Sequence, residues 1–234
     1  NQPKQFLADF FPIIMEKLGQ SNGILTFLEI FQQNLYKKHV ILYARNADLQ
    51  KKISAFNWGG ELRATDRDYL SIVSSNLGGT KTDRFLEHST DLDSTINSDG
   101  TITHKLTYTV KSPLPGIEAL SNKSFIRFYV PHGSKLISSE GFNNYVQLTR
   151  LDETQYTIDP QVREWQSKVT QDTVTHTSTG EEAGKTWLGN WLIVGGGETK
   201  TVTLEYTLPF KVGDLDRHSL LIQKQPGTQT SPFS

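Results

Sequence analysis

A change of hydrophobic period near Gly79 constrains the fold of this 234-residue chain more than any other feature of its sequence. Before this point, apolar residues recur every three or four positions, the spacing that places them on one face of a helix. Beyond it, apolar and polar residues alternate almost to the end, as in strands that bury one face of a sheet. The sequence therefore predicts an α+β chain with a helix-rich beginning and a long antiparallel β part.

Residues 1–80 are predicted to form a small α/β unit. Ser21-Asn22-Gly23 separates two amphipathic helices, and Asn46 is suited to cap a third helix because its side chain can accept a backbone hydrogen bond. Two short β-branched runs predict strands. In chain order, we expect helices over 6–18 and 24–35, a strand over 39–44, a helix over 47–56 and a strand over 68–75.

Residues 81–225 are predicted to form an antiparallel, Ig-like β-sandwich, because many short strands follow one another without intervening helices. The clearest element is a hairpin whose turn is Asn-Ser-Asp-Gly at 97–100. Its alternation pairs Ile96 with Ile102, Ser94 with His104 and His88 with Val110. Further strands are expected over 125–130, 135–137, 145–148, 169–175, 187–194, 201–208 and 219–223.

Glycines at 195–197 are predicted to join the strands 187–194 and 201–208 in a second hairpin. The alternative interpretation, a phosphate-binding loop, is disfavoured because Glu198-Thr199 follows in place of Lys-Ser/Thr and no helix begins there. The tail 226–234 is rich in Pro, Gly, Thr and Ser and is predicted to be a linker.

Charge and composition exclude several classes of function. The chain has 24 Lys+Arg against 25 Asp+Glu without a run of like charges, which disfavours nucleic-acid binding. It contains no cysteine, so disulfides, thiolate zinc sites and iron–sulfur clusters are excluded. No apolar run approaches the roughly 18 residues that a membrane span needs, and no membrane insertion by this chain is predicted.

Two histidines of the first hairpin, His88 and His104, share its inward-facing phase. Six residues at about 3.3 Å each separate them by roughly 20 Å, too far for a shared metal ion. A calcium loop counted from Asp91 fails because Ile96 stands where glycine is needed and Ile102 where glutamate is needed. The sequence therefore predicts structural or solvent-edge histidines, no metal site and no cofactor.

No catalytic residue is predicted. Glu181-Glu182 lies in a Thr- and Gly-rich segment without the second fixed carboxylate that glycoside hydrolysis requires. Three tryptophans are speculative ligand contacts, because aromatic faces can stack on sugar rings: Trp165, Trp187 and Trp191. Trp187 and Trp191 stand four apart in one strand and share a face, so packing within the sandwich is the alternative explanation for them.

Short motifs follow a recognisable order along nearly the whole chain. They are the runs 38–44, 58–60, 68–73, 76–81, 127–131, 206–209 and 223–227, together with Leu49-Gln50, Asp99-Gly100, His104 and Gly133. As a set they resemble the C-terminal half of a bacterial family known as domain of unknown function 4012. The resemblance implies an extracytoplasmic place in the cell envelope, within a parent protein that has an N-terminal membrane anchor.

By this resemblance, residues 1–80 complete an upstream domain, and the whole is a non-catalytic structural or binding module. Its opening at Asn1, directly before an amphipathic stretch, also predicts a piece of a longer polypeptide. Expected partners are a cell-wall polymer or another envelope protein. One alternative is an accessory part of a LytR-CpsA-Psr-like glycopolymer transferase with its active site upstream. The residues of this chain that come nearest in type to the arginines and aspartates of such an active site are Arg63, Arg67 and Asp68, and a salt-bridged strand entrance also explains them. A second alternative is a carbohydrate-binding module.

Overall fold

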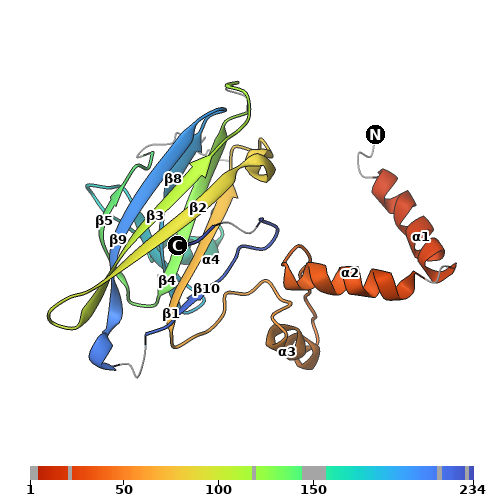
Figure 1. Ribbon diagram of the computed structural model, residues 1–234, viewed down its shortest axis with the longest axis horizontal. Helices are drawn as coiled ribbons and strands as arrows, with labels where there is room; N and C mark the ends of the chain where they lie inside the picture. The colour runs from red at the N-terminus through yellow and green to blue at the C-terminus, as the bar shows by residue number, and fades with distance from the viewer. Residues whose placement is uncertain (1–4, 21–22, 118–119, 144–156, 215–217, 230–231) are drawn as a thin grey trace. The chain divides into compact units, whose positions relative to one another are not determined.

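Two units divide the chain, and each is described by itself. The computed structural model describes residues 5–20, 23–117, 120–143, 157–214, 218–229 and 232–234. The first unit comprises Asn1–Glu61 with Pro226–Thr228, and the second comprises Leu62–Gln225 with Gln229–Ser234. The described residues form four α-helices and ten strands in two antiparallel-rich sheets, so the chain is mixed α+β (Figure 1).

Three helices make up the regular structure of the first unit: α1 (Gln5–Gln20), α2 (Ile24–Tyr36) and α3 (Ala47–Ala55). As predicted, Asn46 caps α3, its side chain accepting from the Leu49 N–H at 3.0 Å. The predicted strand over 39–44 does not form. Its backbone is held at Leu42, which donates to the Trp58 carbonyl, and no strand lies beside it to complete a ladder within the described residues.

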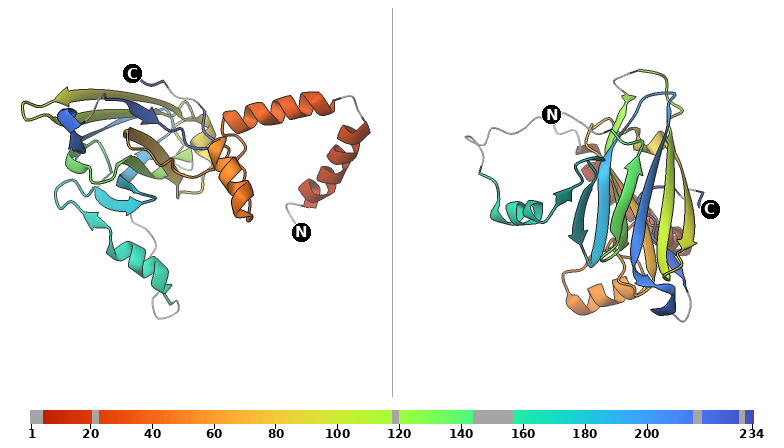
Figure 2. Two further views of the ribbon diagram at one scale, coloured as in Figure 1. Left: turned by 90° about the horizontal axis from the view of Figure 1, so that it is seen from below. Right: turned by 90° about the vertical axis from the view of Figure 1, so that its left-hand side faces the viewer.

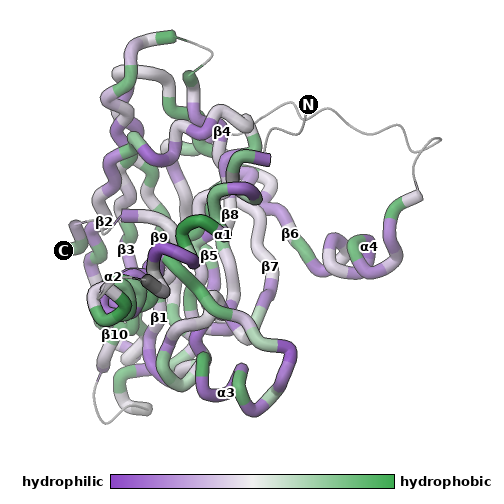
Figure 3. Tube along the Cα trace, turned by 90° about the vertical axis from the view of Figure 1, so that its right-hand side faces the viewer, coloured by the Kyte–Doolittle hydropathy of each residue, from purple (hydrophilic) through white to green (hydrophobic). Residues whose placement is uncertain are grey.

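Apolar side chains of α1 and α2 are exposed along much of both helices. Figure 3 colours the residues of these helices by their hydropathy. None of the described helices combines the length and the hydropathy that crossing a bilayer requires. The exposed apolar residues of these two helices are Phe6, Phe10, Phe11, Ile13, Ile14, Met15, Ile24, Leu25, Phe27, Leu28, Ile30 and Tyr36.

The second unit holds all ten strands, arranged as two sheets (Figures 1 and 2). One sheet has six strands in the order β10-β1-β4-β8-β7-β6, and the other has four in the order β2-β3-β9-β5. Every pairing is antiparallel except that of β1 with β10. The strands are β1 (Asp68–Asn76), β2 (Glu87–Ile96), β3 (Thr101–Lys111), β4 (Asn122–Pro131), β5 (Lys135–Glu140), β6 (Thr170–Gln171), β7 (Ser178–Glu182), β8 (Lys185–Val194), β9 (Thr199–Lys211) and β10 (Leu220–Ile222).

Residues from both sheets meet in one buried cluster, which explains why the strands alternate in hydrophobicity. β4 contributes Ile126 and Phe128, and β9 contributes Leu204 and Tyr206, with one residue between the members of each pair. The sheets therefore pack face to face through the alternate residues that the two-residue period marks. The remaining members are Leu70, Ile102, Leu106, Tyr108, Val110, Val130, Leu188, Leu192, Val194, Val202 and Leu208.

The first hairpin forms in the predicted register. β2 and β3 are antiparallel neighbours, and Asp99 stabilises their turn by accepting from the Thr101 N–H at 3.1 Å. The observed pairs include Ile96 with Ile102, Ser94 with His104 and His88 with Val110, all as predicted.

The second predicted hairpin is wrong, because β8 and β9 belong to different sheets. The glycines between them carry the chain across the sandwich rather than back along the same sheet. A Cβ atom added at Gly196 would lie 1.7 Å from the Pro115 carbonyl oxygen, so only glycine allows this approach. Ser112 fixes the crossing, donating to the Glu198 carbonyl at 2.9 Å and accepting from the Gly197 N–H at 3.0 Å. Alternation alone cannot separate a crossing from a hairpin.

The strand expected over 68–75 forms as β1, but it lies in the sandwich between β10 and β4. The division of the chain accordingly falls between Glu61 and Leu62, ahead of the expected boundary near residue 80. Two 3₁₀ helices, η1 (Thr82–Phe85) and η3 (Val212–Asp214), accompany the strands.

The described end of the tail is not a free linker. Phe233 forms a parallel bridge with Thr90 on the edge strand β2, and Ser234 accepts from the Leu92 N–H at 2.9 Å. These contacts satisfy backbone groups that an edge strand would leave open.

Three further differences from the sequence-based prediction concern the segment 145–182. Of the strand expected over 169–175, only β6 forms, while 145–148 lies outside the described residues. The helix α4 (Pro160–Ser167) and the strand β7 were not predicted. Asp159 caps α4 by accepting from the Gln161 N–H at 2.8 Å, and Pro160 suits its first turn.

Candidate functional site

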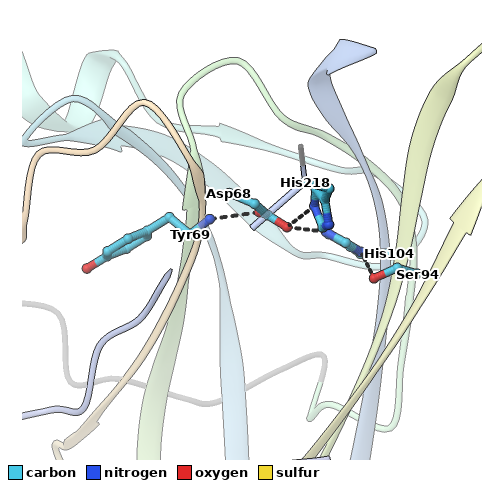
Figure 4. A network of polar contacts seen from close by, with 5 residues as sticks. All are labelled: Asp68, Tyr69, Ser94, His104 and His218. Carbon is cyan, nitrogen blue, oxygen red and sulfur yellow. Dashed lines mark hydrogen bonds and ion pairs between the residues drawn. The ribbon is translucent and has the colours of Figure 1, made fainter. Parts of the chain in front are cut away.

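Three side chains with metal-ligating atoms meet in the second unit: Asp68, His104 and His218 (Figure 4). Asp68 is the first residue of β1 in the six-stranded sheet. His104 lies on β3 in the four-stranded sheet, and His218 lies in the connection that precedes β10. The cluster therefore joins the two sheets and the segment that passes between them.

One carboxylate oxygen of Asp68 is hydrogen-bonded to both imidazole rings. Its Oδ2 lies 2.6 Å from His104 Nε2 and 3.1 Å from His218 Nε2. Its Oδ1 accepts from the Tyr69 N–H at 2.7 Å. Ser94 Oγ lies 2.8 Å from His104 Nδ1, so each nitrogen of the His104 ring has a partner.

Burial differs within the cluster and leaves one approach from solvent. The side chains of Asp68 and His104 are fully buried, whereas that of His218 is 33 % exposed. A buried carboxylate is costly unless donors surround it, and here three donors do so. Access to Asp68 is therefore expected to lead past His218.

Local sequence rules explain how the residues come together. His104 is on the inward phase of β3, opposite Ser94 on β2 and opposite Tyr206 on β9. Asp68 is held at the sandwich end because β1 pairs in parallel with β10, where Asp68 is the partner of Leu220. That pairing also brings the residues before β10 toward β1.

Tyr206 adds an unusual polar atom beside the cluster. Its ring meets that of His104 edge-on, with centroids 5.4 Å apart. Burial, and secondarily the charge of Asp68, raises the pKa of the Tyr206 hydroxyl far above its usual value. Among the described residues this buried hydroxyl has no hydrogen-bond partner, which is rare inside proteins and costs stability.

Two kinds of chemistry are compatible with these groups. Two imidazole nitrogens and one carboxylate oxygen, all within 4.8 Å of one another, form a donor set that suits divalent transition metals. Ser94, His104 and Asp68 also form a hydrogen-bonded chain of nucleophile, base and acid types. The His104 ring, however, has no exposed surface on which a substrate leaving group could take up a proton.

Sequence reasoning treated these residues separately. It placed His104 correctly opposite Ser94, but compared it only with His88 as a metal partner. Asp68 was grouped with the exposed Arg63 and Arg67, whereas its side chain contacts the two histidines. The inward phase of His104 was the one available signal. A single sequence does not show that His104 and His218, which lie 36 and 150 positions from Asp68, contact it in the fold.

Trp187 and Trp191 lie on the same side of β8, as predicted, and both rings meet Phe125 of β4. Trp187 is buried in a small second cluster with Tyr69 and Tyr129. Trp191 is half-buried, and Trp165 is 58 % exposed on α4. The three tryptophans are therefore not brought together: two share one face of β8, and the third lies on a separate helix.

A row of aromatic and charged groups follows this face of the six-stranded sheet, which is turned away from the main core. We call Phe125, Arg127, Glu182, Trp187 and Trp191 the aromatic strip. The Arg127 guanidinium lies 4.8 Å from the Trp187 ring centroid and 3.5 Å from Glu182. Its Nε is buried and has no partner among the described residues. The strip thus combines stacking surfaces with a cation that is 42 % exposed.

The first unit has one further feature, an open hollow of about 550 Å³. It is lined by Ile41, Leu42 and Tyr43 of the extended segment and by Gln50 and Ser54 of α3, with Gly60 and Glu61. A hydrogen bond from Ser54 is the main cause that lowers the pKa of Glu61. The hollow holds one acidic group and no pair of reactive side chains.

Comparison with family models, with curated proteins and with solved structures returns no match. The resemblance to domain of unknown function 4012 therefore stays a prediction.

Proposed function

We propose that this chain is a non-catalytic structural or binding module of a bacterial cell-envelope protein, and that it binds a cell-wall polymer through the aromatic strip. The observation that carries the proposal is the strip itself, which lines aromatic rings beside a partly exposed guanidinium. Rings stack on sugar faces, and a guanidinium donates to hydroxyl, carboxylate or phosphate oxygens. Wall polymers offer all of these groups.

The geometry of the strip supports binding rather than packing alone for part of its members. Trp187 is buried and needs the absence of a side chain at Gly180, where a Cβ would lie 2.4 Å from the ring. Trp191 and Arg127 keep exposed surface on the same face. We therefore propose that Trp187 supports the strip from within, and that Trp191 and Arg127 contact the polymer.

The sandwich supplies the rigid frame that such a site needs. Two sheets packed through a continuous core, joined by a chain crossing at 195–198, favour an Ig-like assignment. In frames of this kind the core stays fixed while outer faces and end loops vary, which suits a spacer or adhesive module.

The first unit is proposed to complete an upstream domain of the parent protein. Its helices α1 and α2 expose many apolar side chains, a pattern typical of surfaces that another segment covers. A dye that fluoresces on apolar surfaces should bind this chain more strongly than an extended version that includes the upstream domain. Equal dye binding by both proteins would argue against covering.

Titration with solubilised peptidoglycan and with wall glycopolymer tests the proposed function. We expect saturable binding that Trp191→Ala weakens about tenfold, the size of one lost stacking contact at roughly 1.4 kcal/mol. Trp165→Ala is the matched control, because Trp165 lies on α4 outside the strip. Equal weakening by both variants would contradict the assignment of the strip, and no binding to any polymer would leave only a spacer role.

A further inference from the structure

We propose that Asp68, His104 and His218 form a binding site for one divalent transition-metal ion, with Zn²⁺ as the best-suited ion. Both histidines present Nε2 to the same carboxylate oxygen, at 2.6 and 3.1 Å. Two imidazoles and one carboxylate are a set that zinc accepts readily, with a fourth position left for water. The site lies beyond the proposed polymer contact and differs from the sequence-based expectation of no metal.

The present geometry is close to that of a filled site. Ligand atoms about 2.0–2.1 Å from a tetrahedral zinc ion stand about 3.3 Å from each other. The distance from His218 Nε2 to Asp68 Oδ2 is already 3.1 Å, and that from His104 Nε2 is 2.6 Å. Both distances lie within about 1 Å of that spacing, and all three ligand atoms lie within 4.8 Å of one another, so a rearrangement of the partly exposed His218 side chain would bring the set to a zinc ion.

Ser94 suits both states of the site. Without metal, the neutral His104 ring can donate from Nε2 to Asp68 and accept at Nδ1 from the Ser94 hydroxyl. With metal, the ring proton belongs on Nδ1, from which it donates to the same hydroxyl oxygen. A hydroxyl can play either role, so the second partner that orients a metal-bound histidine is in place.

Tyr206 is the second, independent observation. Its ring meets that of His104 edge-on with centroids 5.4 Å apart, and its buried hydroxyl has no partner in the described part of the chain. A buried hydroxyl without a partner is unfavourable unless a further group completes the site.

The topology defines what the ion would do. Its ligands come from β1, from β3 and from the connection before β10, thus from both sheets and the segment between them. A bound ion would close loops of 36 and 114 residues, counted from 68 to 104 and from 104 to 218. The site is therefore a structural clamp at one end of the sandwich.

Titration of the chelator-stripped full chain with Zn²⁺ alone tests the site, with Co²⁺ as a spectroscopic probe. We expect one ion per chain, visible Co²⁺ bands of a low-coordinate nitrogen–oxygen site, and a Zn²⁺-dependent rise in Tm. His218→Asn should abolish all three signals. Because His218 is partly exposed, this variant is expected to fold, which circular dichroism checks.

His132→Gln is the matched control, since His132 is also an exposed histidine beside a carboxylate, 3.6 Å from Glu181. It should bind Zn²⁺ like the unchanged chain. Ser94→Ala keeps all three ligands and should bind about tenfold more weakly, as loss of an orienting partner does. Binding that survives His218→Asn, or that His132→Gln reduces equally, would show adventitious surface binding and overturn the proposal.

Discussion

Replacing His104 by leucine in the metal-free protein is the sharpest perturbation of the buried cluster. The change removes a hydrogen bond to a carboxylate that is fully buried, and it leaves His218 and the Tyr69 N–H as its remaining donors. Breaking a buried pair by deleting one partner costs about 3–5 kcal/mol. Since leucine retains most of the side-chain volume, we expect a loss of about 3 kcal/mol, at the lower end.

A second substitution separates charge from packing. Adding Asp68→Asn to His104→Leu removes the uncompensated charge while an amide oxygen can still accept from Tyr69 N–H. The double variant should therefore be more stable than His104→Leu alone by about 1–2 kcal/mol. Urea unfolding, followed by tryptophan fluorescence with a chelator present, measures both differences.

His88→Leu is the matched control on the same hairpin. His88 also faces inward, but its Nδ1 pairs with the neutral hydroxyl of Tyr108 at 2.7 Å. Loss of a neutral hydrogen bond costs about 1 kcal/mol. If His104→Leu costs no more than His88→Leu, or if the double variant is no more stable than His104→Leu alone, the buried carboxylate does not need His104 as argued.

Three further outcomes are expected. Burial lowers the pKa of His88 below its ordinary value of about 6.5. Between these two pKa values the unfolded chain binds more protons than the folded one, so stability should fall as pH drops below about 6.5, and His88→Gln should flatten that dependence in chemical unfolding. Gly196→Ala should cost about 1–3 kcal/mol or more because its Cβ would meet the Pro115 carbonyl at 1.7 Å, whereas Gly213→Ala has nothing within 4 Å and should be nearly neutral in Tm; equal effects would refute the close crossing. A fluorophosphonate probe should leave Ser94 unlabelled by mass spectrometry, since the buried His104 ring cannot reach a substrate; stoichiometric labelling would indicate a hydrolase.

Local patterns predicted local structure well. The alternation around the turn at 97–100 set the register of β2 and β3 correctly, because a slip of one residue would expose their buried face. The cap of α3 at Asn46 follows equally local chemistry. Both features depend on neighbours within about 25 residues along the chain.

Long-range pairing was beyond the same reasoning. The sequence pattern predicted that β8 and β9 form a hairpin. In the structure, β8 pairs with β4 and β7, while β9 pairs with β3 and β5. Similarly, the pattern predicted β1 to be part of the first unit, whereas its partners are β4 and β10 of the second unit. Each strand has the same alternation whichever partner it takes, so the period defines its buried face and leaves its neighbours open.

The candidate site shows the same division. The pairing of His104 with Ser94 follows from the hairpin, and the shared face of Trp187 and Trp191 follows from the strand period. The arrival of Asp68 and His218 depends on the pairing of β1 with β10, which no local signal marks. Clusters assembled by non-local pairing are thus the features that a single sequence conceals.

The central claim, polymer binding by the aromatic strip, can be tested residue by residue because the chain has only four tryptophans. Their indole N–H signals in a ¹H–¹⁵N correlation spectrum can be assigned by single substitutions and followed while wall glycopolymer is added. The account predicts a saturable shift at Trp191, a smaller one at the buried Trp187, and none at Trp58 or Trp165. A shift confined to Trp165, or four unchanged signals at saturating polymer, would contradict it.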